Sequence, residues 1–264
     1  MPVLLRSCST IEEASAALEA GRARYLAGGT LVVRSANEAD LSFETFVRAT
    51  DPDLRRIEVE DNVVTLGAGV TMAQIASHPA LQFLAPAARA VGGPAIRNMA
   101  TVGGNLFAPA PYGDFSVALL ALCAVVDVGG KTVDIDPFLA TRDKGREIVR
   151  AVRFAVPSEG AFRFLKVSRV KPKGVSVLCI AALTDRDGSG EVTTARVALG
   201  CMADRPVRAT AAEDALRGAR LTKDGIEAAV QAVREGIEPI TDPVASAWYR
   251  AEVLPVHFRR LLLD

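Results

Sequence analysis

The sequence is poor in aromatic residues, which make up 5% of its 264 positions, and it has no excess of either charge. Lys and Arg total 31, as do Asp and Glu, so the formal net charge is zero. A neutral chain lacks the basic surface with which proteins bind nucleic acids or anionic membranes. The longest apolar stretch, residues 117–126, is far shorter than the roughly 18 residues of a membrane span, and residues 1–13 do not form a signal peptide. We therefore expect a soluble, cytoplasmic protein with neither nucleic-acid binding nor stable membrane insertion.

Cysteine and histidine are also scarce, with four and two residues. The cysteines form no Cys-x-x-Cys pair, and their spacing matches no zinc or iron–sulfur pattern. Cys123 and Cys179 lie in apolar runs and are interpreted as small core residues. His78 and His257 are far apart in the sequence. We therefore expect neither a metal site on this chain nor a Ser–His–Asp triad.

Hydrophobic residues make up half of the chain, which is enough for a packed core and argues against intrinsic disorder. Because aromatics are few, that core must consist mostly of Ala, Val and Leu. Turn-forming sequences at 51–52 and 157–160 divide the chain. The expected domains are residues 1–54, 55–158 and 159–264.

The first two parts mix strands and helices. Thr10 and Glu13 form a capping-box pattern at the start of a helix, Asp61-Asn62 marks a hairpin turn, and Thr71 and Asp114 are candidate helix caps. Strands are expected over residues 3–5, 24–27, 57–59, 63–66, 124–128, 131–135 and 147–156, and helices over 11–18, 71–75, 84–91 and 114–122.

The third part places a run of strands before a run of helices, which is typical of an α+β fold. Asp187-Gly188 favours a tight turn between the last two strands, and Pro255 should kink the last helix. The expected strands cover residues 162–167, 175–183 and 192–199, and the expected helices cover 211–216, 226–234 and 245–263.

Two glycine-rich segments are candidates for ligand binding. One is Gly28-Gly29-Thr30, after a strand, and the other is the sequence TVGGN at 101–105, inside an uncharged stretch (98–113) without helical or strand periodicity. Adjacent glycines permit close approach of a ligand, and consecutive N–H groups in such turns bind anions such as a pyrophosphate. The alternative is that both are ordinary tight turns. Neither segment matches the common dinucleotide or P-loop motifs.

The order and spacing of these segments carry a specific resemblance. YLAGGT at 25–30 is followed by IRNMATVGGNL at 96–106 and by Gly113-Asp114 before an apolar helix. This pattern resembles the FAD-binding, or medium, subunit of the molybdenum hydroxylases, the family of carbon monoxide dehydrogenase and xanthine dehydrogenase. The similarity continues through FLK at 164–166, ALG at 198–200 and SAWYR at 246–250, so it covers nearly the whole chain.

The resemblance implies a fold and a cofactor site. The fold is a two-part FAD-binding domain of the PCMH type, followed by a C-terminal domain with a three-stranded antiparallel sheet and a helical bundle. Asp114 would bond the ribityl hydroxyls of FAD, although it could simply cap its helix. Lys166 would lie near the isoalloxazine ring and raise its potential, although it could be an exposed strand residue. The pyrophosphate would lie between two segments: Ala27, Gly28, Gly29, Thr30 and Leu31, and Thr101, Val102, Gly103, Gly104 and Asn105.

The resemblance further implies an electron-transfer subunit of a molybdenum-containing dehydrogenase, without a catalytic acid or base of its own. A small partner subunit would carry two [2Fe–2S] clusters and a large one the molybdopterin, in a dimer of heterotrimers. FAD would pass electrons to NAD⁺, a quinone, oxygen or another acceptor. The lack of a cysteine cluster agrees with clusters on a partner chain.

Three departures from the family pattern leave other functions open. Leu31 replaces a Ser or Asp, Val170 and Gly174 replace charged residues in a loop near the flavin of relatives, and the segment 129–147 is short. One alternative is a stand-alone FAD-dependent oxidase or reductase of the same superfamily. The other is an interaction subunit without flavin, which Leu31 and Val170 keep open.

Overall fold

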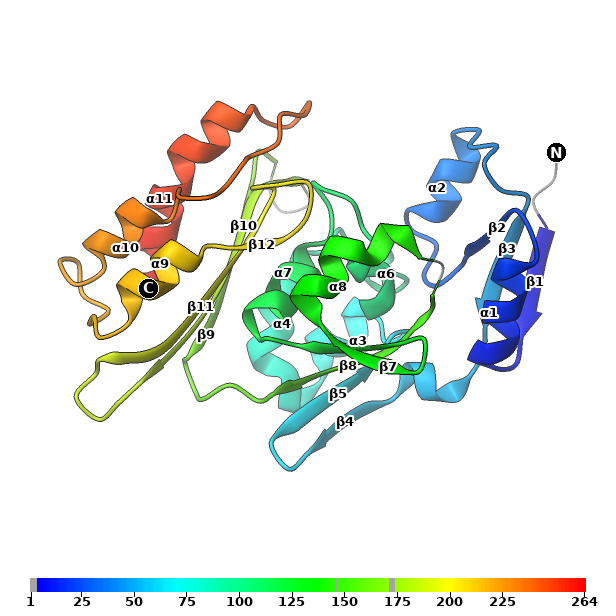
Figure 1. The fold of residues 1–264 in the computed structure, drawn as a ribbon, viewed down its shortest axis with the longest axis horizontal. Coiled ribbons are helices and arrows are strands. Elements are labelled where there is room, and N and C mark those ends of the chain that lie inside the picture. The colour runs from blue at the N-terminus through cyan, green and yellow to red at the C-terminus, as the bar shows by residue number, and fades with distance from the viewer. Residues whose placement is uncertain (1–3, 146, 171–173) are drawn as a thin grey trace.

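The computed structural model describes residues 4–145, 147–170 and 174–264, and three β-sheets follow one another along the chain (Figure 1). The first sheet is parallel with strand order β1-β3-β2. Its expected first strand included Val3, which lies outside the described residues. The central strand was not predicted, because its sequence TFVRA mixes polar and apolar residues without clear alternation. The elements of this part are β1 (Leu4–Cys8), α1 (Ile11–Glu19), β2 (Ala23–Tyr25), α2 (Val32–Asn37) and β3 (Thr45–Ala49).

The cap of α1 differs in one detail from the expected capping box. Thr10 Oγ1 accepts from the Glu13 N–H at 3.2 Å, as predicted. The Glu13 carboxylate accepts from the N–H and the hydroxyl of Ser9, at 2.9 and 2.8 Å, and not from Thr10. The carboxylate therefore reaches one residue further back and satisfies a donor ahead of the helix.

The second sheet is antiparallel with five strands in the order β4-β5-β8-β6-β7. The predicted hairpin is confirmed, with Asp61 and Asn62 both at positive φ in its turn. The strands are β4 (Ile57–Glu60), β5 (Val63–Gly67), β6 (Val125–Val128), β7 (Lys131–Asp134) and β8 (Val149–Ala155). The helices are η1 (Pro52–Arg55), α3 (Met72–Ser77), η2 (Pro79–Leu84), α4 (Ala85–Ala90), α5 (Pro94–Arg97), α6 (Val102–Leu106), α7 (Asp114–Ala121), α8 (Ile135–Thr141) and η3 (Arg142–Lys144).

Three expectations for this part were wrong. The TVGGN segment is a helical turn, α6, capped by Thr101, and not an irregular loop. Gly113, in a left-handed conformation, is the N-cap of α7, so Asp114 is its first helical residue and does not cap it. Cys123 is exposed at a positive-φ turn after α7, and is no core residue. All eight residues of α7 are buried, which places the Asp114 carboxylate in the interior.

The third sheet has the order β12-β11-β10-β9 and is antiparallel. Three long strands form the predicted sheet, and the two-residue β12 adds a fourth. Pro255 lies inside the last helix, which continues past it. The elements are β9 (Phe162–Ser168), β10 (Ser176–Arg186), β11 (Val192–Gly200), β12 (Val207–Arg208), α9 (Thr210–Leu216), α10 (Glu227–Ala232) and α11 (Ala247–Leu263).

The third sheet separates two hydrophobic cores. Leu178 and Ile180 of β10 pack with the core of α9–α11, whereas Cys179 and Ala181 pack with the larger core that contains α7. Burial of both faces explains the nearly continuous apolar sequence of β10. The α+β fold is thereby confirmed, and the start of β10 lies against α7 of the second part. No helix among the described residues is long and apolar enough to span a membrane.

Candidate functional site

A cleft of about 1560 Å³ is lined by residues from all three parts of the chain. Its walls include the loop between β2 and α2, helix α2, the segment from α5 to the start of α7, and residues 174–176 at the start of β10. This volume exceeds that of typical pockets for small ligands. The cleft is therefore large enough for a dinucleotide. In the described parts of the chain, no cluster of three His, Cys, Asp or Glu residues could hold a metal ion.

The first glycine segment brings two backbones into contact. A Cβ atom on Gly28 would lie 1.8 Å from the carbonyl oxygen of Met99, so only glycine fits there. Gly29 has a φ of +76°, which side chains other than glycine rarely tolerate. The glycine pair thus lets the β2–α2 loop lie directly against the segment that precedes α6.

The same loop presents a row of unpaired main-chain donors. Leu26 donates to Val47 O and Val33 donates to Gly29 O. Between them, the N–H groups of residues 27–31 donate to no acceptor among the residues that the structure describes. Free N–H groups need a partner, which is either water or a ligand. Consecutive free amides on the wall of a cleft form an anion-binding surface.

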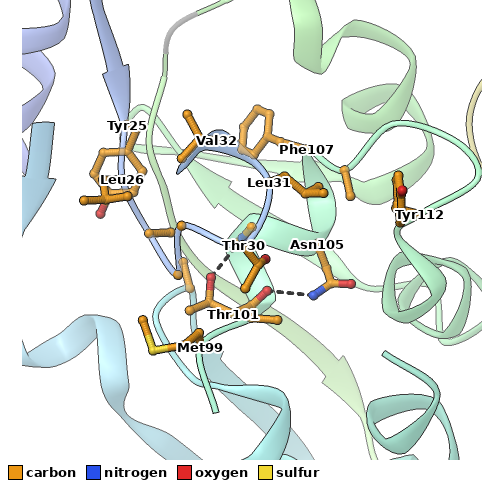
Figure 2. A pocket seen from close by; sticks show the side chains of 18 of the residues that line it. Tyr25, Leu26, Thr30, Leu31, Val32, Met99, Thr101, Asn105, Phe107 and Tyr112 are labelled. Atoms are coloured by element: carbon orange, nitrogen blue, oxygen red, sulfur yellow. Dashed lines mark hydrogen bonds between the residues drawn. The ribbon is translucent and has the colours of Figure 1, made fainter. Parts of the chain in front are cut away.

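The second glycine segment differs, because its amides are used within the chain (Figure 2). Val102 donates to Val70 O at 2.9 Å and Gly103 to Ala68 O at 2.8 Å. Gly104 donates to Thr101 Oγ1 at 3.1 Å, and both the N–H and the side-chain amide of Asn105 donate to Thr101 O at 3.0 Å. This segment therefore lines the cleft with side chains and with glycines that carry no side chain. Its amides 102–105 are not available to a ligand, because they are bonded within the chain.

The two glycines of α6 have different surroundings. A Cβ on Gly103 would lie 3.0 Å from Ala68 Cβ and 3.2 Å from Ala68 O, so this glycine allows α6 to pack on the segment after β5. A Cβ on Gly104 would meet only Thr101 Oγ1, at 3.1 Å. Gly103 is consequently a packing position, and Gly104 is the one with open space beside it.

A buried ion pair also lines the cleft. Lys166 Nζ donates to Asp114 Oδ2 at 2.7 Å and to Ala90 O at 2.8 Å. Ser176 Oγ donates to Asp114 Oδ1 at 2.5 Å. The side chains of Lys166 and Asp114 are 15% and 9% exposed, so Lys166 is not an exposed strand residue. The sequence analysis predicted that Asp114 and Lys166 belong to the site but missed Ser176. A single serine in a strand gives no signal of such a contact.

Two cysteines lie beside this ion pair. Burial, reinforced by the negative charge of Asp114, raises the pKa of the Cys201 thiol to about 12. The same two causes raise the pKa of Cys179 well above its usual range. Both thiols are therefore protonated and unreactive at neutral pH.

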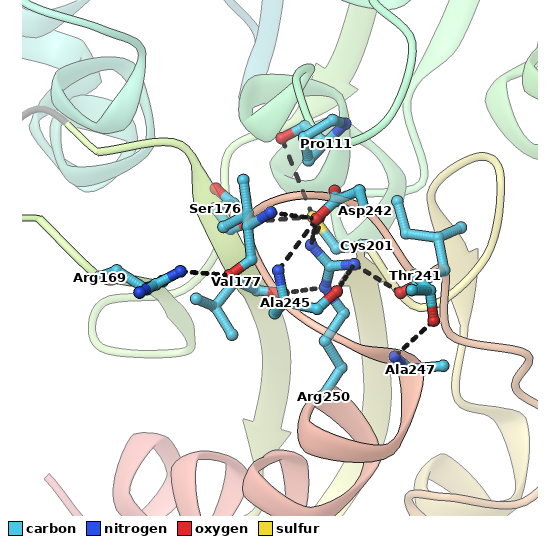
Figure 3. Close-up of polar contacts among 12 residues, drawn as sticks. Pro111, Arg169, Ser176, Val177, Cys201, Thr241, Asp242, Ala245, Ala247 and Arg250 are labelled. Carbon is cyan, nitrogen blue, oxygen red and sulfur yellow. Dashed lines mark hydrogen bonds and ion pairs between the residues drawn. The ribbon is translucent and has the colours of Figure 1, made fainter.

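Two buried arginines hold the walls of the cleft. Arg142, from η3, donates to the carbonyl oxygens of Leu106 and Ala108, and burial lowers its pKa. Arg250 of α11 donates to Val177 O at 2.7 Å and pairs with Asp242 at 2.9 Å (Figure 3). Arg142 thus fixes the segment after α6, and Arg250 fixes α11 to the strand that carries Ser176.

Comparisons with known proteins identify the family. Residues 5–157 match the model of the FAD binding domain in molybdopterin dehydrogenase, and residues 163–264 match that of the CO dehydrogenase flavoprotein C-terminal domain. The FAD subunit of nicotinate dehydrogenase from Eubacterium barkeri is 28% identical, over 97% of this chain and 93% of that protein. The glyceraldehyde dehydrogenase medium chain of Sulfolobus acidocaldarius is 28% identical over 77% of this chain and 76% of that protein.

The fold of this chain is also similar to that of a chain in a solved structure. It is a carbon monoxide dehydrogenase from Hydrogenophaga pseudoflava that lacks the Mo-pyranopterin moiety of its molybdenum cofactor. The match has a TM-score of 0.91 and 26% identity, over 99% of this chain and 96% of the other. Together with the two domain matches, it shows that this chain belongs to the family of FAD-binding medium subunits of molybdenum-containing dehydrogenases.

Proposed function

We propose that this chain is the electron-transfer subunit of a molybdopterin and iron–sulfur dehydrogenase. It would receive electrons from the [2Fe–2S] clusters of a small partner subunit, while a large subunit with molybdopterin oxidises the substrate. FAD bound in the cleft would supply the redox chemistry and deliver electrons to an external acceptor. The complex would be a dimer of heterotrimers. We also propose the domain limits 1–54, 55–158 and 159–264, because each of these parts contains one of the three sheets.

The row of free amides at residues 27–31 is the observation that carries this proposal. We assign these donors to the pyrophosphate of FAD. Leu31 lacks the hydroxyl or carboxyl that many relatives have here, yet its main-chain N–H belongs to the same free row. The leucine therefore removes a side chain without removing the main-chain donor, which weakens the case for a subunit without flavin.

The second glycine segment completes the pyrophosphate site in a different way. Its amides 102–105 are already bonded, so we assign its contribution to the surface of Gly104 and to the side chains of Thr101 and Asn105. Asn105 uses its side-chain N–H₂ toward Thr101 O, and its amide oxygen is the acceptor that remains. Val102 and Gly103 act in packing, because both donate to the segment after β5.

We place the ribityl chain and the isoalloxazine ring toward Asp114 and Lys166. Lys166 is neutralised by Asp114, so the pair presents a fixed dipole and no net positive charge. Ser176 donates to the other oxygen of the same carboxylate and helps to fix its orientation. The pair would therefore raise the flavin potential less than an unpaired lysine.

Purification of the native complex tests this function. The expected result is a flavin absorption spectrum, release of intact FAD on denaturation, and co-purification of molybdenum and iron with two partner chains. A colourless chain that cannot be reconstituted with FAD would indicate the interaction subunit without flavin. Substrate turnover by this chain alone would indicate the stand-alone oxidase or reductase.

A further inference from the structure

Helix α2 has unusually little support from the rest of the protein. None of its residues, Val32–Asn37, is buried. Figure 1 shows it projecting from the first sheet, in contrast to α1, which packs on that sheet. A six-residue helix is not stable without tertiary contacts. Side-chain contacts of α2 with other parts of the chain must therefore hold the helix in place.

One side-chain bond joins α2 to the opposite wall of the cleft. Arg34 Nη1 donates to the hydroxyl of Tyr112 at 3.3 Å, although the two residues are 78 positions apart. Arg34 Nε also donates to Glu38 at 2.8 Å, which orients the guanidinium along the helix. Both Arg34 and Tyr112 line the cleft, and Figure 2 shows Tyr112 and the base of α2, at Leu31 and Val32, among its lining residues.

The position of this bond relates it to the cofactor site. The free amides of residues 27–31 lie in the loop that leads directly into α2. Tyr112 lies two residues before Asp114, which forms the buried ion pair with Lys166. A movement of α2 away from Tyr112 would open the cleft and carry the loop with it, because Val33 donates to Gly29 O and Ser35 to Leu31 O.

We propose that α2 is a flap that closes over a bound dinucleotide, and that Arg34 and Tyr112 are positioning residues that latch it. The inference rests on the proposed binding of FAD in this cleft. The latch slows the escape of the dinucleotide, because release requires the Arg34–Tyr112 bond to break. It contributes little to the stability of the protein without cofactor, because it joins side chains that are largely exposed.

Release of FAD from the purified complex tests the latch. Tyr112→Phe removes only the hydroxyl, and Arg34→Met removes the guanidinium but keeps a stem of similar length. We expect each variant to release FAD about three- to tenfold faster, which corresponds to loss of one hydrogen bond. The rate is measured from the growth of free FAD fluorescence after dilution. Tyr249→Phe on α11, an exposed tyrosine outside the cleft, is the matched control and should leave the rate unchanged.

A double variant distinguishes a latch from two independent effects. Tyr112→Phe with Arg34→Met should release FAD no faster than either single variant, because both remove the same bond. The melting temperature of the protein without FAD should be the same in all variants. Unchanged release rates, or effects that add in the double variant, would overturn the inference. Wild-type protein that binds no FAD would instead contradict the proposed function.

Discussion

The two glycine segments look alike in sequence but present different surfaces to the cleft. Around Gly28-Gly29, five consecutive amides have no acceptor among the described residues, and the backbone lies against Met99. In Thr101–Asn105, the amides of residues 102–105 are bonded within the chain. The first segment is thus suited to donate hydrogen bonds to an anion, and the second to form a compact wall beside it. A Gly-Gly pair by itself does not reveal which of these two roles it has.

The largest effect is expected from Gly28→Ala. The added Cβ would overlap the carbonyl oxygen of Met99, and neither backbone can move without separating the two walls of the cleft. We expect FAD affinity to fall at least about 100-fold, or roughly 3 kcal/mol, as measured by fluorescence titration. Gly188→Ala is the control, because a Cβ there meets nothing within 4 Å. Normal FAD binding by Gly28→Ala would show that this close contact is not required.

Asp114→Asn tests the ion pair that lines the cleft outside both glycine segments. The substitution removes the negative partner of Lys166, whose remaining acceptors are Ala90 O and the neutral amide oxygen of the asparagine. An unpaired cation stabilises the anionic reduced flavin, so we expect the midpoint potential to rise by about 30 mV for each 1.4 kcal/mol of added stabilisation. Spectroelectrochemical titration measures this shift. A potential identical to that of the wild type would place the flavin ring away from this pair.

Thr101→Val probes the internally bonded segment. Thr101 is the N-cap of α6, and its hydroxyl accepts from the Gly104 N–H. Valine keeps the shape of threonine but removes this acceptor. We expect the free energy of unfolding to fall by about 1 kcal/mol in urea denaturation, with a smaller loss of FAD affinity than in Gly28→Ala. An equal loss of FAD affinity in Thr101→Val and Gly28→Ala would contradict the different roles assigned to the two glycine segments.

The smallest effect is expected from Gly104→Ala. Its Cβ would approach only Thr101 Oγ1, and alanine favours a helix over glycine by about 0.5–1 kcal/mol. We expect unchanged or slightly higher thermal stability and at most about a threefold loss of FAD affinity. Gly103→Ala is the matched comparison and should lower the melting temperature, because its Cβ would press on Ala68. A reversed order of these two variants would contradict the assignment of Gly103 to packing.

Local sequence signals predicted much of the fold correctly. Asp61-Asn62 tolerates positive φ, so the hairpin at 57–66 follows from the turn itself. Thr71 caps α3 as predicted, and Gln74 completes a capping box that the sequence analysis did not include. The three long strands of the third sheet also follow from their apolar sequences. These features depend on neighbouring residues, which a sequence displays directly.

Elements supported by distant contacts were missed. Helix α2 buries no residue, so it has no apolar periodicity to detect. Arg142 holds the segment after α6 from 34 to 36 positions away, and no local pattern marks it. Ser176 bonds to Asp114 only because β10 lies beside the start of α7.

The sequence by itself determined the family resemblance, the α+β class and the two glycine segments, because motifs and periodicity are local properties of a chain. Only the tertiary structure decided that the amides of residues 27–31 have no acceptor among the described residues, whereas those of residues 102–105 are bonded within the chain. It also decided that Lys166 is paired with Asp114 and that Arg34 reaches Tyr112. The physical reason is that a hydrogen bond depends on where a second group lies, and folding brings that group from a distant part of the chain.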